Sequence, residues 1–86
     1  MKVEGVEISE ETIRAALDAL LVNEVPFPFR AMTMSLRVKG VGAAQVDRCA
    51  SRVLRRETKA GRLRSDWNGK DFMFSEAAKE QGGKDG

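Results

Sequence analysis

Histidine and tyrosine are absent from the 86-residue chain, and Cys49 is its single cysteine. Without histidine the chain lacks the side chain that titrates near neutral pH, and one cysteine supports neither a disulfide framework nor a zinc site built on cysteines. No nucleophile is accompanied by the base that usually activates it. We therefore expect no enzymatic activity, no metal site and no cofactor.

Long apolar runs are lacking as well. No stretch approaches the roughly 20 residues that a membrane-spanning helix needs, and the N-terminus lacks the basic-then-apolar order of a signal peptide. These absences predict a cytoplasmic protein in which Cys49 stays reduced. Cys49 lies among apolar residues of a charged segment, which favours a buried small hydrophobe over a reactive thiol.

Length and composition fit one small globular domain, because 86 residues with 42% hydrophobic side chains can form one economical core. The formal net charge is only +2, but it is distributed unevenly. Residues 1–24 hold two basic and six acidic side chains, a net charge of −4. Residues 45–64 hold seven basic and two acidic side chains, a net charge of +5, so the positive charge is concentrated in one segment.

The first part of the chain predicts a short strand and a helix. Residues 2–8 are too short and too polar for a helix but could form a partly covered edge strand. Ser9 is a suitable N-cap, and the acidic residues after it favour the positive end of a helix dipole. Apolar side chains then follow at helical spacing, at Ile13, Ala16, Leu17, Leu20 and Leu21. A first helix is therefore expected from Ser9 to about Asn23.

A second helix is predicted over about residues 28–38, after a stiff Pro-Phe-Pro segment in which each proline fixes its own φ. Pro28 is suited to the first position of this helix. Gly40 can then adopt the left-handed conformation that ends a helix, Val41 can insert into the core, and Gly42 leads into a third helix. Two helices joined by a short glycine-containing turn form the pattern of a helix-turn-helix.

The third helix, from about Gln45 to Lys59, separates two kinds of side chain. Each residue is rotated by about 100° from the previous one, so Gln45 and the cations fall within an arc of about 100° and the apolar residues fill the neighbouring arc. The apolar residues are Val46, Cys49, Val53 and Leu54, and the cations, called the basic stripe below, are Arg48, Arg52, Arg55, Arg56 and Lys59. Like charges on successive turns repel by about a few tenths of a kcal/mol per pair, which favours an anionic partner. A purely solvated face is the alternative, but such faces usually mix signs and this stripe contains no acid.

Residues 62–75 contain the clearest hairpin pattern. Gly61 ends the third helix, and Asn68-Gly69 between two extended runs favours a two-residue type I′ turn. Counting outward from this turn pairs Trp67 with Lys70, Ser65 with Phe72, and Leu63 with Phe74, and it places Asp66 opposite Asp71. This register is expected to bury the face that carries Leu63, Trp67, Phe72 and Phe74. Trp67 is open to a second interpretation, an exposed ring that contacts a partner.

The order of helix, helix, glycine turn, basic helix and Asn-Gly hairpin resembles a winged helix-turn-helix over about residues 9–75. The resemblance implies a mainly α fold with a small antiparallel β-hairpin, in a single domain of residues 1–75. Residues 76–86 are polar and glycine-rich and are expected to form a disordered tail. The chain is similar to small transcriptional regulators of bacteria and phages. These bind double-stranded DNA with the second helix of the motif in the major groove and the hairpin, or wing, on the backbone or minor groove.

Carried over to this sequence, the resemblance implies specific DNA contacts. Base edges would face Ala43, Ala44, Gln45, Arg48 and Arg52. Phosphates would meet Arg55, Arg56 and Lys59 on the same helix, the wing residues Arg62, Arg64, Asn68 and Lys70, and the clamping residues Arg30 and Lys39. Arginine can bond bidentately to guanine and glutamine to adenine, so the side chains of this helix suit sequence-specific binding.

A second function stays open, because winged helices serve more than one role. The same basic stripe would suit a protein-interaction module, for example a phage factor that occupies an acidic, DNA-like surface on a host protein. Asp66 and Asp71 weaken the wing assignment, since a wing that binds DNA usually carries cations. Neither interpretation specifies a target sequence, a regulatory sign or an oligomeric state.

Overall fold

Three helices and two small antiparallel β units make up residues 1–77, the part of the chain that the computed structural model describes. The helices are α1 (Glu10–Leu21), α2 (Phe29–Val38) and α3 (Ala43–Lys59). Strands β1 (Lys2–Val3) and β2 (Val6–Glu7) pair with each other. Strands β3 (Phe27–Pro28), β4 (Leu63–Trp67) and β5 (Phe72–Glu76) form a sheet of order β3-β5-β4. The three predicted helices and the antiparallel hairpin after them are confirmed.

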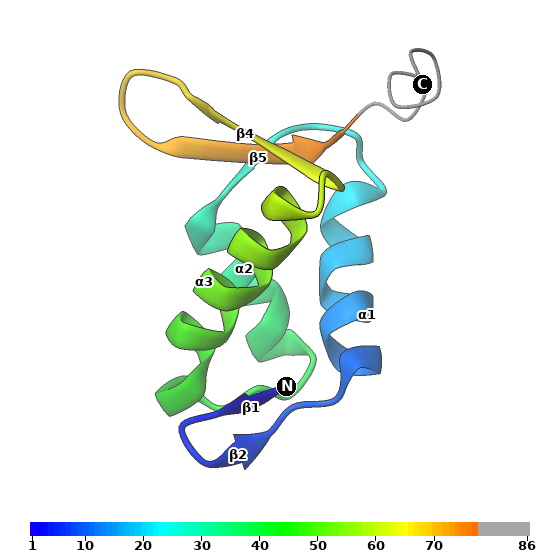
Figure 1. Cartoon of the computed structure of the whole chain (residues 1–86), viewed down its shortest axis with the longest axis vertical. Coiled ribbons are helices and arrows are strands. Elements are labelled where there is room, and N and C mark those ends of the chain that lie inside the picture. Colours follow the sequence, from blue (N-terminus) through cyan, green and yellow to red (C-terminus); the bar gives the residue numbers. More distant parts are fainter. Residues whose placement is uncertain (78–86) are drawn as a thin grey trace.

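The two β units lie at opposite ends of the helices (Figure 1). The β1–β2 hairpin is at the end where α1 and α3 begin, and the three-stranded sheet is at the end where they finish. The β4–β5 hairpin projects sideways beyond the helices, so its tip is exposed. No helix within residues 1–77 has both the length and the apolar character needed to cross a membrane.

The first two helices begin in different ways, because α1 has a side-chain cap hydrogen bond and α2 has none within residues 1–77. Ser9 Oγ accepts from the Thr12 backbone N–H at 3.1 Å, which makes Ser9 the N-cap of α1 as predicted. Pro28 differs from its prediction by one position, because it is the N-cap of α2 and the helix begins at Phe29. Its extended backbone, with ψ at 171°, belongs to the strand that precedes the helix.

Glycines end the second and third helices in the same way. Gly40 and Gly61 have φ angles of 103° and 84°, a conformation that is strained for residues with a Cβ. Each is flanked by the hydrogen bond that completes a Schellman motif, from Val41 N–H to Leu36 O at 3.0 Å and from Arg62 N–H to Glu57 O at 2.9 Å. The turn between α2 and α3 is therefore short and begins with a left-handed glycine, as the glycine pattern predicts.

The core forms where the apolar arcs of the three helices meet. Its helical members are Ile13, Ala16 and Leu17 from α1, Met32 and Leu36 from α2, and Val46, Cys49, Ala50, Val53 and Leu54 from α3. Val41 is also buried, so the turn between α2 and α3 contributes to the core as predicted. Cys49 is a free cysteine with no exposed surface, which confirms its predicted burial.

The register of the C-terminal hairpin differs from the prediction by two residues. The pairs are Leu63 with Glu76, Arg64 with Ser75, Ser65 with Phe74, Asp66 with Met73, and Trp67 with Phe72. Because the shift is even, each side chain keeps its predicted face, but Asp66 no longer stands opposite Asp71. Glu76, predicted to begin the tail, is the last residue of β5. Residues 78–86, the rest of the predicted tail, lie outside the described residues.

The Asn68 side chain accounts for the shifted register. Its Oδ1 accepts from the backbone N–H groups of Lys70 and Asp71, both at 2.8 Å, so Asn68 closes the turn instead of occupying its centre. Gly69, with φ at 96°, becomes the first central residue. Glycine at that position is typical of a type II′ turn, whereas the prediction assumed type I′.

Only part of the hairpin is buried, which corrects the predicted packing of its aromatic face. Leu63 is buried and Phe74 is half-buried, but Trp67 and Phe72 are 59% and 56% exposed. Their rings meet edge to face, with centroids 5.1 Å apart. The hairpin extends past the helices, so nothing within residues 1–77 covers the aromatic face near its tip.

Two short strand pairs were not predicted as such. The stiff segment before α2 is strand β3, and it pairs with β5 through Phe27–Phe74 and Pro28–Met73. Proline cannot donate a backbone hydrogen bond, which suits the edge position of β3.

Residues 2–8 form their own hairpin instead of an edge strand of the main sheet. Glu4 and Gly5 both have positive φ angles, 52° and 81°, and reverse the chain between β1 and β2. Val3 and Ile8 are buried in the core, whereas Val6 is exposed. The hairpin therefore covers one end of the helices with two apolar side chains.

Candidate nucleic-acid interface

The basic stripe lies along the side of α3 that faces away from the core. Arg48, Arg52, Arg55 and Lys59 are exposed, and Arg56, at the edge of the stripe, is half-buried. The opposite side of the helix is buried, so the predicted division of α3 into a basic and an apolar side is confirmed. The residues of the stripe nevertheless have different surroundings.

The N-terminal hairpin supplies partners for two of these arginines. Glu4 Oε2 lies 2.7 Å from Arg48 Nε, and the Lys2 carbonyl accepts from Arg52 Nη1 at 2.8 Å. The side chains of Arg48 and Glu4 remain 67% and 44% exposed. Exposed pairs of this kind contribute about 0.2 to 1 kcal/mol, so an anionic partner can displace them at low cost.

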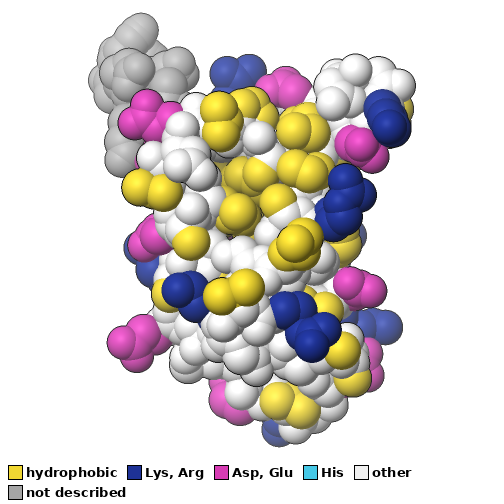
Figure 2. Space-filling view, turned by 180° about the vertical axis from the view of Figure 1, so that it is seen from behind, with side chains coloured by type: hydrophobic (Ala, Val, Ile, Leu, Met, Phe, Trp, Pro, Cys, Tyr) yellow, Lys and Arg dark blue, Asp and Glu magenta, His cyan; other side chains and the backbone are white. Residues whose placement is uncertain are grey.

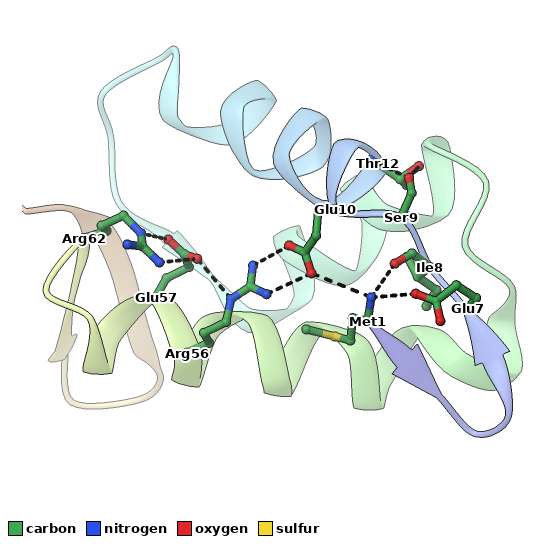
Figure 3. Close-up of polar contacts among 9 residues, drawn as sticks. All are labelled: Met1, Glu7, Ile8, Ser9, Glu10, Thr12, Arg56, Glu57 and Arg62. Carbon is green, nitrogen blue, oxygen red and sulfur yellow. Dashed lines mark hydrogen bonds and ion pairs between the residues drawn. The ribbon is translucent and has the colours of Figure 1, made fainter.

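Arg56 is held by two carboxylates (Figure 3). It meets Glu10 through two contacts, Nη2 to Oε1 at 3.0 Å and Nη1 to Oε2 at 3.1 Å, and it donates from Nε to Glu57 at 3.2 Å. The hydrogen bond from Arg56 lowers the pKa of Glu10, and the same bond raises the pKa of Arg56. The α-amino group of Met1 lies 3.7 Å from Glu10 and extends the cluster. Arg56 thus joins α3 to the start of α1.

Glu57 is a buried carboxylate at the end of α3, only 5% exposed. Arg62 donates two hydrogen bonds to it, from Nε to Oε1 at 2.6 Å and from Nη2 to Oε2 at 3.1 Å, and Arg56 Nε is the third donor. The hydrogen bond from Arg62 is the main cause of a lowered pKa of Glu57, and it raises the pKa of Arg62. Arg62, predicted as a wing contact, therefore holds the junction between α3 and β4.

The first turn of α3 brings small residues to the surface. Ala43 and Ala44 are exposed, whereas Gln45 is half-buried. Gln45 Oε1 lies so close to Gly42 that a Cβ on residue 42 would stand 2.7 Å from it. The Gln45 amide is folded back onto the turn, and the two alanines leave the helix surface open to close approach.

The predicted contacts outside α3 are all at the surface. Arg30 on α2 and Lys39 at its end are exposed, as are Arg64 and Lys70 on the hairpin. Arg64 Nη2 is 3.8 Å from Asp66, a loose pair between two exposed side chains. Asn68 is exposed too, but its side-chain oxygen is occupied by the turn.

Arg55 and Lys59 flank an apolar cleft of about 420 Å³ between α3, the start of α2 and the β4–β5 hairpin. Its apolar residues are Phe29, Leu54, Phe72 and Phe74, and its hydroxyl groups come from Ser51, Thr58 and Ser65. Thr58 Oγ1 is shielded from solvent and has no hydrogen-bond partner within residues 1–77. The cleft was not predicted, because it depends on how the hairpin stands over α3.

Figure 2 shows the molecule from behind relative to Figure 1, with hydrophobic side chains gathered in the upper half and both basic and acidic side chains around them. Elsewhere, exposed apolar residues of α2 and of the segment between α1 and α2 include Val22, Val25, Met34 and Val38. A polyanion favours a surface of one sign, so the outer side of α3 is the better candidate for a nucleic-acid interface.

The contact of the N-terminal hairpin with α3 was also not predicted, although the sequence contains a signal for it. Residues 1–24 and 45–64 carry opposite net charges of −4 and +5, which favours pairing between them.

Comparisons with protein-family models, curated proteins and solved structures found no match to this chain. Its function is therefore inferred from its side chains and their arrangement.

Proposed function

We propose that this protein binds double-stranded DNA as a winged helix-turn-helix domain, with α3 as the recognition helix and the β4–β5 hairpin as the wing. The observation that carries the proposal is the exposure of four cations on successive turns of α3, namely Arg48, Arg52, Arg55 and Lys59. At the helical rotation of about 100° per residue they share an arc of about 60°. A helix with one cationic side fits the major groove, which is about 12 Å wide.

The order of the elements supports the same proposal. The short glycine turn joins α2 to α3, and the hairpin follows α3 after a second glycine. In a helix-turn-helix the first helix of the motif crosses the DNA backbone, so Arg30 and Lys39 are suited to phosphate contacts. On the wing, Arg64 and Lys70 are exposed cations and can meet phosphates in the same way.

Within α3 the proposed contacts divide by position. Arg48, in the first half of the helix, and Arg52, at its middle, are assigned to base edges, and Ala44 permits close approach near the start. Arg55 and Lys59, nearer the end, are assigned to phosphates. Gln45, Arg56 and Arg62 are less suited to contact DNA, because the first is folded onto the turn and the other two are held by carboxylates.

Titration of duplex DNA at several salt concentrations tests the proposal. The six cations assigned to phosphates, namely Arg30, Lys39, Arg55, Lys59, Arg64 and Lys70, predict a log-log slope of about −5.4. Arg55→Gln and Lys59→Gln, made separately, should each make that slope shallower by about 0.9. Arg14→Gln, which removes an exposed cation of α1, is the matched control and should leave it unchanged. Undetectable binding, or equal changes in Arg14→Gln and Arg55→Gln, would refute the assignment.

Sequence reading requires a second measurement. A preferred site is first selected from a random duplex pool, and Arg48→Ala is then compared on that site and on random DNA. The substitution should cost about 1 to 3 kcal/mol on the preferred site and much less on random DNA, because a base contact is lost. Lys59→Ala should weaken binding to the preferred site and binding to random DNA by the same factor. If the two substitutions behave alike, α3 does not read bases.

A protein-interaction module is the second candidate, and the exposed pair of Trp67 and Phe72 on the wing favours it. Aromatic side chains are enriched in protein interfaces. Replacing Asp66 and Asp71 by asparagine separates the two candidates. A wing on DNA would lose phosphate repulsion and bind more tightly, mostly at low salt, since exposed charges are screened over about 10 Å at 0.1 M. Unchanged or weaker DNA binding would favour a protein partner.

A further inference from the structure

The cleft beside α3 has an apolar floor that is only partly covered. Phe29 and Phe72 line it and are both exposed, and Leu54 and Phe74 extend the apolar surface inward. Aromatic surface left in water is a source of binding free energy when a ligand covers it. The cleft volume of about 420 Å³ falls within the range of roughly 300 to 1,000 Å³ that is usual for small-molecule sites.

The rim of the cleft is positive. Arg55 and Lys59 are one turn apart on α3, and within residues 1–77 neither forms an ion pair with an acidic side chain. Two neighbouring cations repel each other, and an anion placed between them removes that repulsion. The rim therefore favours a ligand with a negatively charged group, whereas the floor favours a ligand with an apolar body.

We propose that this cleft binds a small organic anion with an aromatic or aliphatic body, such as an aryl carboxylate. The body lies against Phe29 and Phe72. The anionic group lies between Arg55 and Lys59. The site is additional to DNA binding, and its test does not require DNA.

Two related dyes test the two halves of the site. Anilinonaphthalene sulfonate combines aromatic rings with one negative charge, and phenylnaphthylamine has the same rings without the sulfonate. Fluorescence titration of the whole protein should show saturable binding of both dyes, and the sulfonate should bind more tightly. Circular dichroism of each variant verifies that the fold is retained.

The charge requirement is tested by the double variant Arg55→Gln/Lys59→Gln. It should lower the affinity for the sulfonate about three- to tenfold, because two exposed charge contacts are lost, and change the affinity for the uncharged dye by less than about twofold. The matched control Arg14→Gln/Arg37→Gln removes two exposed cations outside the cleft and should leave both affinities unchanged.

The apolar floor is tested by a single substitution. Phe72→Ser should weaken binding of both dyes, because both place their rings against this side chain. Absence of saturable binding would overturn the proposal. Equal affinities of the two dyes for the native protein, or equal losses in the cleft variant and its control, would overturn it as well.

Discussion

At the scale of single residues, Glu57 shows how a charge is accommodated in a small core. Its carboxylate is removed from water, yet three guanidinium nitrogens from Arg56 and Arg62 lie within 3.2 Å of it. The Schellman motif that ends α3 brings Arg62 back beside Glu57, so the pairing is largely a local consequence of helix termination. A buried charge is tolerated when its hydrogen bonds are complete.

Glu57→Gln should therefore destabilise the fold by about 1 to 3 kcal/mol, because two arginines lose a charged acceptor. Urea unfolding of the variant and of the native protein measures the difference. Asp47→Asn removes an exposed carboxylate from the same helix and should have little effect. A comparable loss in Asp47→Asn would mean that net charge, and not the buried contacts, is responsible.

The same pair predicts how stability depends on pH. The pKa of Glu57 is lower in the folded state than in the unfolded state, chiefly through the hydrogen bond from Arg62. The contribution of Glu57 to the free energy of unfolding is complete above the unfolded pKa, about 4.3. It is lost as the pH falls through the lower pKa of the folded state. The stability difference between native protein and Glu57→Gln should shrink across that acid range. A difference that is constant with pH would contradict the assignment.

Cys49 gives a second test at this scale. Burial raises the pKa of its thiol and also blocks access to reagents. A thiol reagent should label the native protein very slowly at neutral pH and the urea-unfolded protein rapidly. Fast labelling of the folded protein would contradict the burial of this face of α3.

At the scale of elements, the N-terminal hairpin lies beside the basic helix. Glu4 contacts Arg48, and the backbone of Lys2 contacts Arg52. These contacts reduce the repulsion along the basic stripe without an external partner. They also compete with any anion that approaches the start of α3.

Glu4→Gln should consequently strengthen binding to duplex DNA, by about two- to fivefold at low salt, because Arg48 no longer has a competing carboxylate. Glu11→Gln changes the net charge by the same amount but removes an acid that has no ion pair within residues 1–77. Its effect on affinity should be smaller. Equal gains in the two variants would show that only net charge matters.

The β4–β5 hairpin shows which strand properties a sequence specifies. The alternation of side chains assigned each residue to its face correctly. The pairing was wrong by two residues because Asn68 stands opposite Asp71: its side-chain oxygen accepts from the Lys70 and Asp71 N–H groups, and its backbone N–H donates to the Asp71 carbonyl. Asparagine and glycine allow both arrangements, so the dipeptide alone does not select one of them.

At the scale of the whole molecule, α3 contributes residues to the core, to the proposed DNA interface and to the cleft. Arg55 and Lys59 belong both to the proposed DNA contacts and to the rim of the cleft. An anion in the cleft would neutralise two cations that the proposed DNA interface also uses. Binding of the two partners is therefore expected to be mutually antagonistic.

Anilinonaphthalene sulfonate should accordingly weaken DNA binding in proportion to its occupancy of the cleft. Phenylnaphthylamine should have little effect, because it leaves both cations free. Measuring DNA affinity at several concentrations of each dye separates the two cases. If DNA affinity stays constant while the sulfonate saturates the cleft, Arg55 and Lys59 do not contact DNA.

The sequence by itself determined the features that arise from neighbouring residues. Ser9, Gly40 and Gly61 set helix ends through caps within a few positions, and the helical period divided α3 into a basic and an apolar side. It also identified all four exposed cations of α3, since their positions on the helix follow from rotation alone.

Only the tertiary structure decided which groups meet across long separations. The contact of Arg52 with Lys2 spans 50 positions and that of Arg56 with Glu10 spans 46. The exposure of Trp67 and the cleft under the hairpin depend on where the hairpin stands relative to the helices. Opposite charges attract each other, and apolar side chains associate with each other, in both cases with little directional preference. Composition therefore favours ion pairs and apolar contacts in general, but the packing of the whole chain selects which residues meet.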